Sequence, residues 1–222
     1  YDSILTTSSG SKTSYTTGFG VTSAATPMTA GHVGLMHQMW SAGIFGNAVT
    51  PGASVFANRP RMSTAKALMI NTASPYPFTG ATADLRRVRQ GWGRADVSRM
   101  YNLRGSMIVV NEADALTNLQ TKTYRATVPA GSPEFRATMV YTDPAGTANS
   151  TRHRVNDLTL KVTSPAGAVY WGNSGMLDGN TTTAGGTANV VYTVENVWVP
   201  SPAAGQWTIE VIASVRNCRP GG

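Results

Sequence analysis

The sequence predicts two parts of different fold class: a helical part over residues 1–104 and an all-β sandwich or jelly roll over residues 105–222. In the first part the dominant pattern is a helix that is apolar on nearly every side. After about residue 106, apolar residues alternate with polar ones, which is the period of strands with one buried face. Because the pattern changes near Arg104-Gly105, we expect the boundary there.

The first helix is expected from Ala24 to about Ala42. A helix with apolar residues on all sides belongs in the centre of a larger domain. Pro27 is tolerated only near the first turn, where the backbone N–H has no helical partner, so this helix should begin close to Ser23. Two shorter helices are expected over residues 64–72, with Ser63 as the cap, and 95–103. These two short helices cannot cover the apolar surface of the first helix, so we expect residues 1–104 to be only part of a domain.

Short strands separated by tight turns are expected in the second part. Pro-Ala-Gly recurs at 129–131, 144–146 and 165–167, and proline and glycine supply the backbone angles that turns need. Such regularly punctuated strands are typical of a β-sandwich or jelly roll. The expected strands span residues 107–110, 121–128, 135–141, 158–162, 190–199 and 207–213.

Composition and charge exclude several classes of protein. Only 13% of the 222 residues are charged, against roughly 25% in an average chain. The net charge is +7, but the basic residues are scattered and form no stripe with aromatic residues, so nucleic-acid binding is not expected. No apolar run is long enough to span a membrane, and the lone Cys218 excludes an intrachain disulfide. The low charge favours a secreted protein, although no signal peptide opens the chain.

One serine stands where an irregular segment meets the first helix, in the run Gly20-Val21-Thr22-Ser23-Ala24-Ala25-Thr26-Pro27. At a helix N-terminus the backbone N–H is free and the helix dipole is positive. Both features would stabilise an oxyanion that forms beside the hydroxyl of Ser23. Taken alone, a Thr-Ser pair before a helix is usually only a cap.

This run resembles the subtilisin-like serine proteases around their nucleophile, whose pattern is Gly-Thr-Ser-x-Ala-x-Pro-x-x-x-Gly. The matching residues are Thr22, Ser23, Ala25, Pro27 and Gly31. Residues 67–73 are similar to the family's late helix, and residues 91–96 to the Gly-aromatic-Gly segment that closes the catalytic domain. Residues 155–167, 194–197 and 205–211 resemble the jelly-roll domain that follows in one branch of the family.

The resemblance implies an α/β fold for residues 1–104, as the C-terminal portion of a subtilisin-like parallel-sheet domain, followed by a jelly-roll domain. It implies a secreted endopeptidase that cleaves proteins or peptides, with Ser23 as nucleophile and the backbone at Thr22 and Ser23 supporting the oxyanion. The family's catalytic Asp and His and its oxyanion Asn precede the serine. The expected partner is therefore the N-terminal portion of the same protease, and the chain alone should be inactive.

The histidines of this chain do not replace the missing base. His32 and His37 lie roughly 13–14 Å and 21 Å from Ser23 along the expected helix, whereas a general base must reach its proton within about 3 Å. His153 belongs to the β-rich part. Two positions depart from the family pattern beside the nucleophile. Val21 replaces a glycine, which raises the possibility of a degenerate enzyme, and Ala24 replaces an oxidation-sensitive methionine.

Calcium is the one cofactor that the resemblance suggests, and no organic cofactor is expected. Calcium binds clustered carboxylate and carbonyl oxygens, and jelly-roll domains of this kind often hold it near Asn-Asp-Leu and Glu-Asn segments. The candidate ligands are Asp157, Glu195, Asp178 and Asp143. The alternative is that these acids cap turns or accept backbone N–H groups.

Two non-enzymatic interpretations remain open. The chain could be a protease-derived structural or binding subunit, which Val21 and the absent base favour. Alternatively, residues 105–222 alone could be an adhesion or carbohydrate-binding sandwich, with Trp171, Trp198 and Trp207 on its sugar-binding face. Packing in the core or at a strand edge is the more usual role of such tryptophans.

Overall fold

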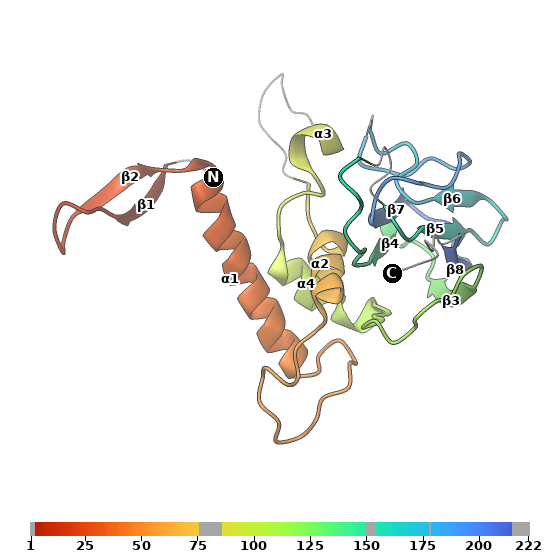
Figure 1. The fold of residues 1–222 in the computed structure, drawn as a ribbon, viewed down its shortest axis with the longest axis horizontal. Helices are drawn as coiled ribbons and strands as arrows, with labels where there is room; N and C mark the ends of the chain where they lie inside the picture. Colours follow the sequence, from red (N-terminus) through yellow and green to blue (C-terminus); the bar gives the residue numbers. More distant parts are fainter. Residues whose placement is uncertain (1–2, 76–85, 150–153, 178, 215–222) are drawn as a thin grey trace. The chain divides into compact units, whose positions relative to one another are not determined.

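The computed structural model of the chain describes residues 3–75, 86–149, 154–177 and 179–214. By its packing the chain divides into two units, Tyr1–Arg59 and Pro60–Gly222 (Figure 1). The boundary expected near residue 104 is a division by fold class, and it stays a prediction.

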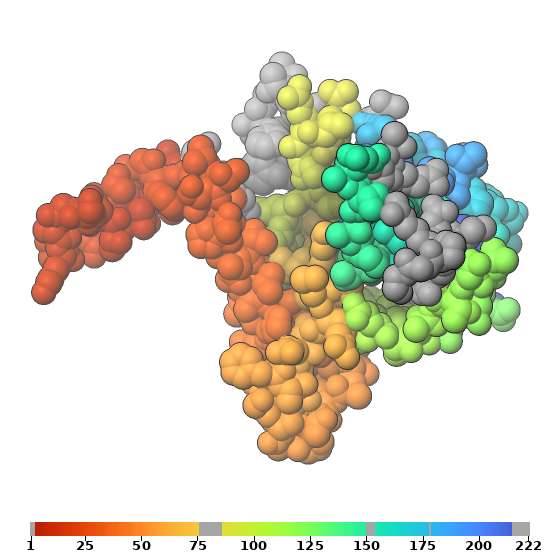
Figure 2. Space-filling model, viewed as in Figure 1, coloured from red at the N-terminus to blue at the C-terminus, as the bar shows by residue number. Residues whose placement is uncertain are grey.

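The first unit consists of a β-hairpin, a long helix and a loop. Strands β1 (Ile4–Thr7) and β2 (Tyr15–Phe19) pair antiparallel, and helix α1 (Val21–Ser41) follows β2 after a single residue. The hairpin extends away from the first turn of α1 and does not fold back along the helix (Figures 1 and 2). Neither strand is evident from the sequence, because its Ser, Thr and Gly residues give weak alternation of apolar and polar positions.

Helix α1 begins at Val21, two residues earlier than expected, so Pro27 lies inside the helix. Because proline has no N–H, the carbonyl of Ser23 lacks the hydrogen bond that position 27 would otherwise donate. At the other end, Gly43 takes a φ of 69° and donates its N–H to the carbonyl of Trp40. This left-handed residue closes the helix, as glycine commonly does.

The second unit is rich in antiparallel strands. One sheet has the order β3-β8-β5-β6, and β4 and β7 form a second sheet. The strands are β3 (Thr121–Val128), β4 (Glu134–Val140), β5 (Leu158–Thr163), β6 (Val169–Trp171), β7 (Val194–Pro200) and β8 (Gly205–Ala213). Both sheets contribute to one core around Trp207, which stacks on Phe135 with 4.7 Å between ring centres. The unit is thus β-rich, while the jelly-roll connectivity and the parallel sheet implied for residues 1–104 stay predictions.

Two expected strand segments differ from the structure. Residues 107–110 form no strand, and β7 begins at Val194, so residues 190–193 precede it as loop. An apolar run becomes a strand only where a neighbouring strand is in register to pair with it. The sequence shows the apolar run but does not show whether such a neighbour exists.

Short helices precede the strands of the second unit: α2 (Met62–Asn71), α3 (Arg87–Gln90) and α4 (Val97–Leu103), with a 3-10 turn at Arg104–Ser106. Helix α2 packs against β4 (Figure 1). Asp96 caps α4 by accepting the N–H of Arg99 at 2.8 Å. Ser63 does not cap α2 as expected, because the helix already begins at Met62 and the buried Ser63 hydroxyl donates to Glu112. Among the described helices, none is both long enough and apolar enough to cross a membrane.

Candidate functional site

Ser23 lies in the first turn of α1 and is exposed, as is Thr22. Gly20 is extended, with φ −167° and ψ −153°, and joins β2 directly to the helix. The first N–H groups of a helix have no partner within it, and the positive end of the helix dipole acts at the same place. An exposed hydroxyl, a free backbone N–H and a positive local potential therefore coincide at Ser23. The hydroxyl of Thr26 donates to the carbonyl of Thr22 at 2.9 Å.

Val21 has a backbone conformation that a valine rarely adopts. Its φ is 55°, in the left-handed region, where a β-branched side chain is a steric outlier. The family pattern has glycine at this position, which adopts such angles without strain. The sequence shows the replacement of glycine, and the structure adds that the valine takes the angle suited to glycine. Strain of this kind is of order 1–3 kcal/mol and often occurs beside functional residues.

The described histidines lie along the same continuous helix as Ser23. An unbroken α1 from Val21 to Ser41 keeps His32 and His37 roughly 13–14 Å and 21 Å along the axis from Ser23. The Nδ1 atom of His32 lies 2.6 Å from the carbonyl oxygen of Met28, so its ring is held against its own helix. Both distances are far beyond the reach of about 3 Å that direct proton transfer from Ser23 to a histidine ring requires. His153 lies outside the described residues.

Helix α1 combines an uncharged sequence with extensive exposure. Its 21 residues include no Asp, Glu, Lys or Arg, and only Ala24, Met36 and Trp40 are buried. The side chains of Val21 and Leu35 are 70% and 52% exposed, respectively. Exposed helices normally carry polar and charged residues on their open side. On α1 the exposed side chains are instead uncharged, and Val21, Met28 and Leu35 are the large apolar ones among them.

Two segments that resemble the protease family meet in the second unit. Ser74, just after α2, and Arg94 exchange backbone hydrogen bonds of 2.8 and 2.9 Å. A Cβ on Gly93, whose φ is 109°, would come within 2.7 Å of the carbonyl oxygen of Ser74. The close approach and the backbone angle both require glycine at position 93. The Gly-aromatic-Gly segment is thus held against the end of the α2 segment by backbone geometry.

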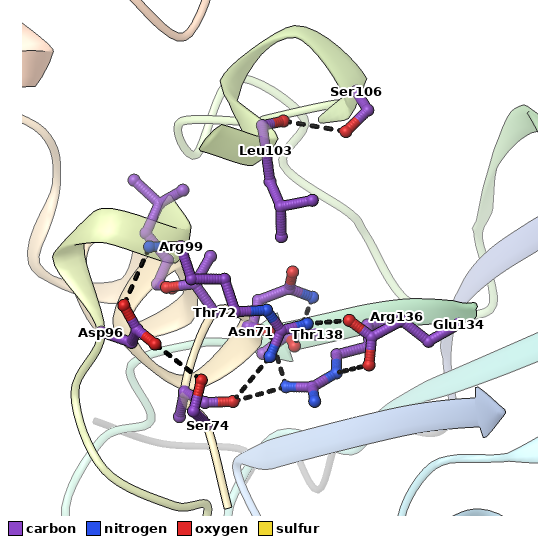
Figure 3. Close-up of polar contacts among 12 residues, drawn as sticks. Asn71, Thr72, Ser74, Asp96, Arg99, Leu103, Ser106, Glu134, Arg136 and Thr138 are labelled. Carbon is purple, nitrogen blue, oxygen red and sulfur yellow. Dashed lines mark hydrogen bonds and ion pairs between the residues drawn. The ribbon is translucent and has the colours of Figure 1, made fainter. Parts of the chain in front are cut away.

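An arginine pair continues this contact onto strand β4, as Figure 3 shows. Arg99 donates to the carbonyl of Ala73 at 3.0 Å and pairs with Glu134. Arg136 donates to the carbonyls of Asn71 and Ala73 at 3.0 and 2.7 Å, and its Nε donates to Glu134 at 3.0 Å. Burial, followed by the charge of Arg99, lowers the pKa of Arg136 to about 9, so the group stays charged at neutral pH. The network fixes the end of α2 to strand β4.

Asp96 and Ser74 support the same network from the side of α4. The hydroxyl of Ser74 donates to Asp96 at 2.8 Å. Burial opposes the ionised form of Asp96, but the N–H of Arg99, the Ser74 hydroxyl and the charges of Arg94 and Arg99 together outweigh it and lower the pKa of this carboxyl. The sequence does not reveal this network, because its members are separated by up to 65 residues.

The predicted calcium ligands are placed as follows. Asp143 accepts hydrogen bonds from the backbone N–H groups of Val155 and Asn156 at 2.6 and 2.9 Å. Asp157 pairs with Arg154, whose guanidinium also lies 3.7 Å from Glu195. Asp178 lies outside the described residues. Within the described ranges, no three or more His, Cys, Asp or Glu residues gather into a group suited to a metal ion.

Glu195 is the most buried of these acids, with 0% of the residue exposed. It accepts the N–H of Leu160 at 2.8 Å. Burial raises its pKa to about 8, although the N–H of Leu160 and the charge of Arg154 lower it in part. Within the described residues its other carboxylate oxygen, Oε1, has no hydrogen-bond partner and lies 3.7 Å from Arg154.

The three tryptophans do not form one open face. Trp207 is 1% exposed, and its Nε1 donates to the carbonyl of Ala203 at 2.9 Å. The guanidinium of Arg136 lies 3.8 Å from the ring centre of Trp198. Lys161 lies 6.0 Å from the ring of Trp171. A sugar-binding face that uses all three rings is therefore excluded by the burial of Trp207.

Comparisons with known proteins give little further information. No family model matches the chain, and no curated protein is similar in sequence. Among solved structures, a serine protease of Aeromonas sobria is similar to this chain with a TM-score of 0.24 and 19% identity. The match covers 89% of this chain and 38% of that chain. At this TM-score the likeness does not establish a common fold.

Proposed function

We propose that this chain carries the nucleophile of a subtilisin-like serine endopeptidase. In this proposal Ser23 attacks the scissile carbonyl of a protein or peptide, and its own N–H donates to the oxyanion. The observation that carries the proposal is the setting of Ser23, an exposed hydroxyl in the first turn of an uncharged and largely exposed helix. The low charge of the chain supports secretion as part of the same proposal.

The base must come from another segment, because neither described histidine reaches Ser23. We assign it to the N-terminal portion of the same protease, which would supply the His that accepts the proton, the Asp that orients that His, and the oxyanion Asn. The exposed apolar surface of α1, including Met28 and Leu35, is where this portion would pack. Complete burial of an exposed side chain of this kind contributes about 1.5–3 kcal/mol, and these side chains, which are 36% and 52% exposed, would contribute roughly half of that each.

The test is labelling of the full chain, isolated with its N-terminal portion, by a fluorophosphonate probe. Such probes phosphonylate an activated serine but not an ordinary hydroxyl. Mass spectrometry of the peptides should find the adduct on Ser23, and Ser23→Ala should remove it. Ser41→Ala is the matched control, because Ser41 lies at the other end of α1, and this variant should label like the wild type. Absence of the adduct while the N-terminal portion is present would refute the catalytic role.

A second function is favoured by one observation. The left-handed φ of Val21 places a bulky side chain two residues before the serine, where the family has glycine. If this side chain obstructs the substrate, the chain is a non-catalytic, protease-derived subunit that binds through α1. Val21→Gly distinguishes the two functions, because labelling that appears only in this variant would identify an obstructed site.

Packing of a partner on α1 is tested separately from catalysis. Leu35→Glu introduces a charge on the exposed side of the helix, so it should abolish co-purification with the N-terminal portion. Val191→Glu places the same charge at an exposed position of the β-rich unit and should leave co-purification unchanged. If Leu35→Glu retains the partner, the proposed contact is wrong even where Ser23 is labelled.

A further inference from the structure

Four oxygen atoms surround the guanidinium of Arg154 in the β-rich unit. One terminal nitrogen donates to the carbonyl of Tyr192 at 2.8 Å and lies 3.7 Å from a carboxylate oxygen of Glu195. The other donates to the carbonyl of Asn189 at 3.0 Å and to the carboxylate of Asp157. Apart from Asp157, which lies three residues after Arg154, these partners belong to residues 189–195, so one side chain joins two segments that are far apart in the sequence.

The cluster is buried and largely preformed. The side chain of Arg154 is 3% exposed and that of Glu195 is 0% exposed. The side-chain oxygen of Asn189 accepts the N–H groups of Val191 and Tyr192 at 2.8 and 3.0 Å. This local turn fixes the two carbonyl oxygens that Arg154 reaches. The oxygens therefore converge because the loop is folded to present them.

Two carboxylates and two backbone carbonyls are the donor set of a calcium site. Here the same four oxygens face a guanidinium, whose planar fork of N–H groups suits several acceptors at once. A calcium ion would have to displace the Arg154 side chain, which already donates to Asp157 and to both carbonyls and lies 3.7 Å from Oε1 of Glu195.

We infer that Arg154 is the built-in cation of the β-rich unit and that Asp157 and Glu195 hold no calcium while it is present. The inference does not rest on the proposed protease activity. It replaces the expectation that these two acids bind calcium. It also implies that removal of the Arg154 side chain leaves a buried site for an external cation, and that guanidinium compounds are the best fit.

The experiment measures the thermal unfolding midpoint of the full chain. Added calcium or a chelator should leave the wild-type midpoint unchanged. Arg154→Ala should lower the midpoint by roughly 10 °C, because it leaves buried carboxylates without their partner. Millimolar methylguanidinium should restore part of this loss, whereas the same concentration of sodium chloride should not. The matched control is Arg125→Ala, since Arg125 is exposed on β3, and neither a loss nor a restoration is expected there.

Three results would overturn the inference. One is a calcium-dependent rise in the wild-type midpoint that Asp157→Asn abolishes. Another is an Arg154→Ala midpoint equal to that of Arg125→Ala. The third is a folded Arg154→Ala variant that methylguanidinium does not stabilise. If Arg154→Ala fails to fold, Arg154→Lys is the test variant, because lysine keeps the positive charge but lacks the forked N–H groups of arginine. An unfolding midpoint equal to that of the wild type in Arg154→Lys would also overturn the inference.

Discussion

Arg136 should be the side chain that holds the end of helix α2 to strand β4, and Arg136→Met tests this. Methionine keeps much of the length of arginine but removes every donor. Two carbonyl contacts, at 3.0 and 2.7 Å, and the contact with Glu134 are lost. Hydrogen bonds from a charged group contribute about 1.5–3 kcal/mol each. Since Arg99 still reaches Ala73 and Glu134, we expect a net loss of about 2–4 kcal/mol.

The assay is urea unfolding of the full chain, followed by tryptophan fluorescence and compared with Arg125→Met as the exposed control. The control should remain within about 0.5 kcal/mol of the wild type. Hydrogen exchange should rise in the last turn of α2, because Asn71 and Ala73 lose their anchor, while amides in β5 and β8 keep their protection relative to the global stability. A loss in Arg136→Met no larger than in the control would refute the anchoring role. So would Arg136→Lys with full wild-type stability, because lysine cannot reproduce the forked contacts.

Three further predictions concern single positions. Val21→Gly should stabilise the first unit by about 1 kcal/mol by relieving the left-handed φ, measured by circular dichroism melting, and Val21→Ala should not. Gly172→Ala should destabilise the second unit by about 1–3 kcal/mol in urea unfolding, because its Cβ would overlap Glu195; Gly105→Ala, which meets nothing within 4 Å, should not. Burial raises the pKa of Glu195 from 4.5 to about 8, so the folded protein keeps a proton that the unfolded chain releases. Wild-type stability should therefore fall by at most about 5 kcal/mol as pH rises across that interval, and urea titrations should show that Glu195→Gln lacks this slope; equal slopes would contradict the assignment.

The local alternation of apolar and polar residues was sufficient to predict many of the strands of the second unit. The alternation of Phe135 and Met139 with polar neighbours predicts β4, and both side chains do lie in the core. Residues 107–110 have a similar apolar character but form no strand. The difference is the presence of a partner: β4 pairs along its whole length with β7. Pairing depends on residues far away in the sequence, so composition alone does not decide it.

The position of Ser23 at the start of a helix could be predicted, because it depends on local sequence. The backbone angle of Val21 could not, since it depends on how β2 enters the helix. The buried cluster around Arg154 is a second feature that could not be predicted from the sequence. The sequence indicates Asp157 and Glu195 as acids near turns, and suggests a metal ion between them. It does not show that an arginine reaches both, because that requires the fold of the loop around Asn189 and Tyr192.

The uncharged sequence of α1 has a consequence for the rate of assembly. Charged surfaces attract their partners over long distances and can raise association rates to about 10⁸–10⁹ M⁻¹s⁻¹. In Tyr1–Arg59 the only charged side chains are Asp2, Lys12 and Arg59, so a partner that packs on α1 meets almost no local field. Its encounter with the helix should occur at the unsteered rate of about 10⁵–10⁶ M⁻¹s⁻¹ and change little with ionic strength. If the partner is the N-terminal portion proposed above, slow encounter favours assembly while the two segments are covalently joined.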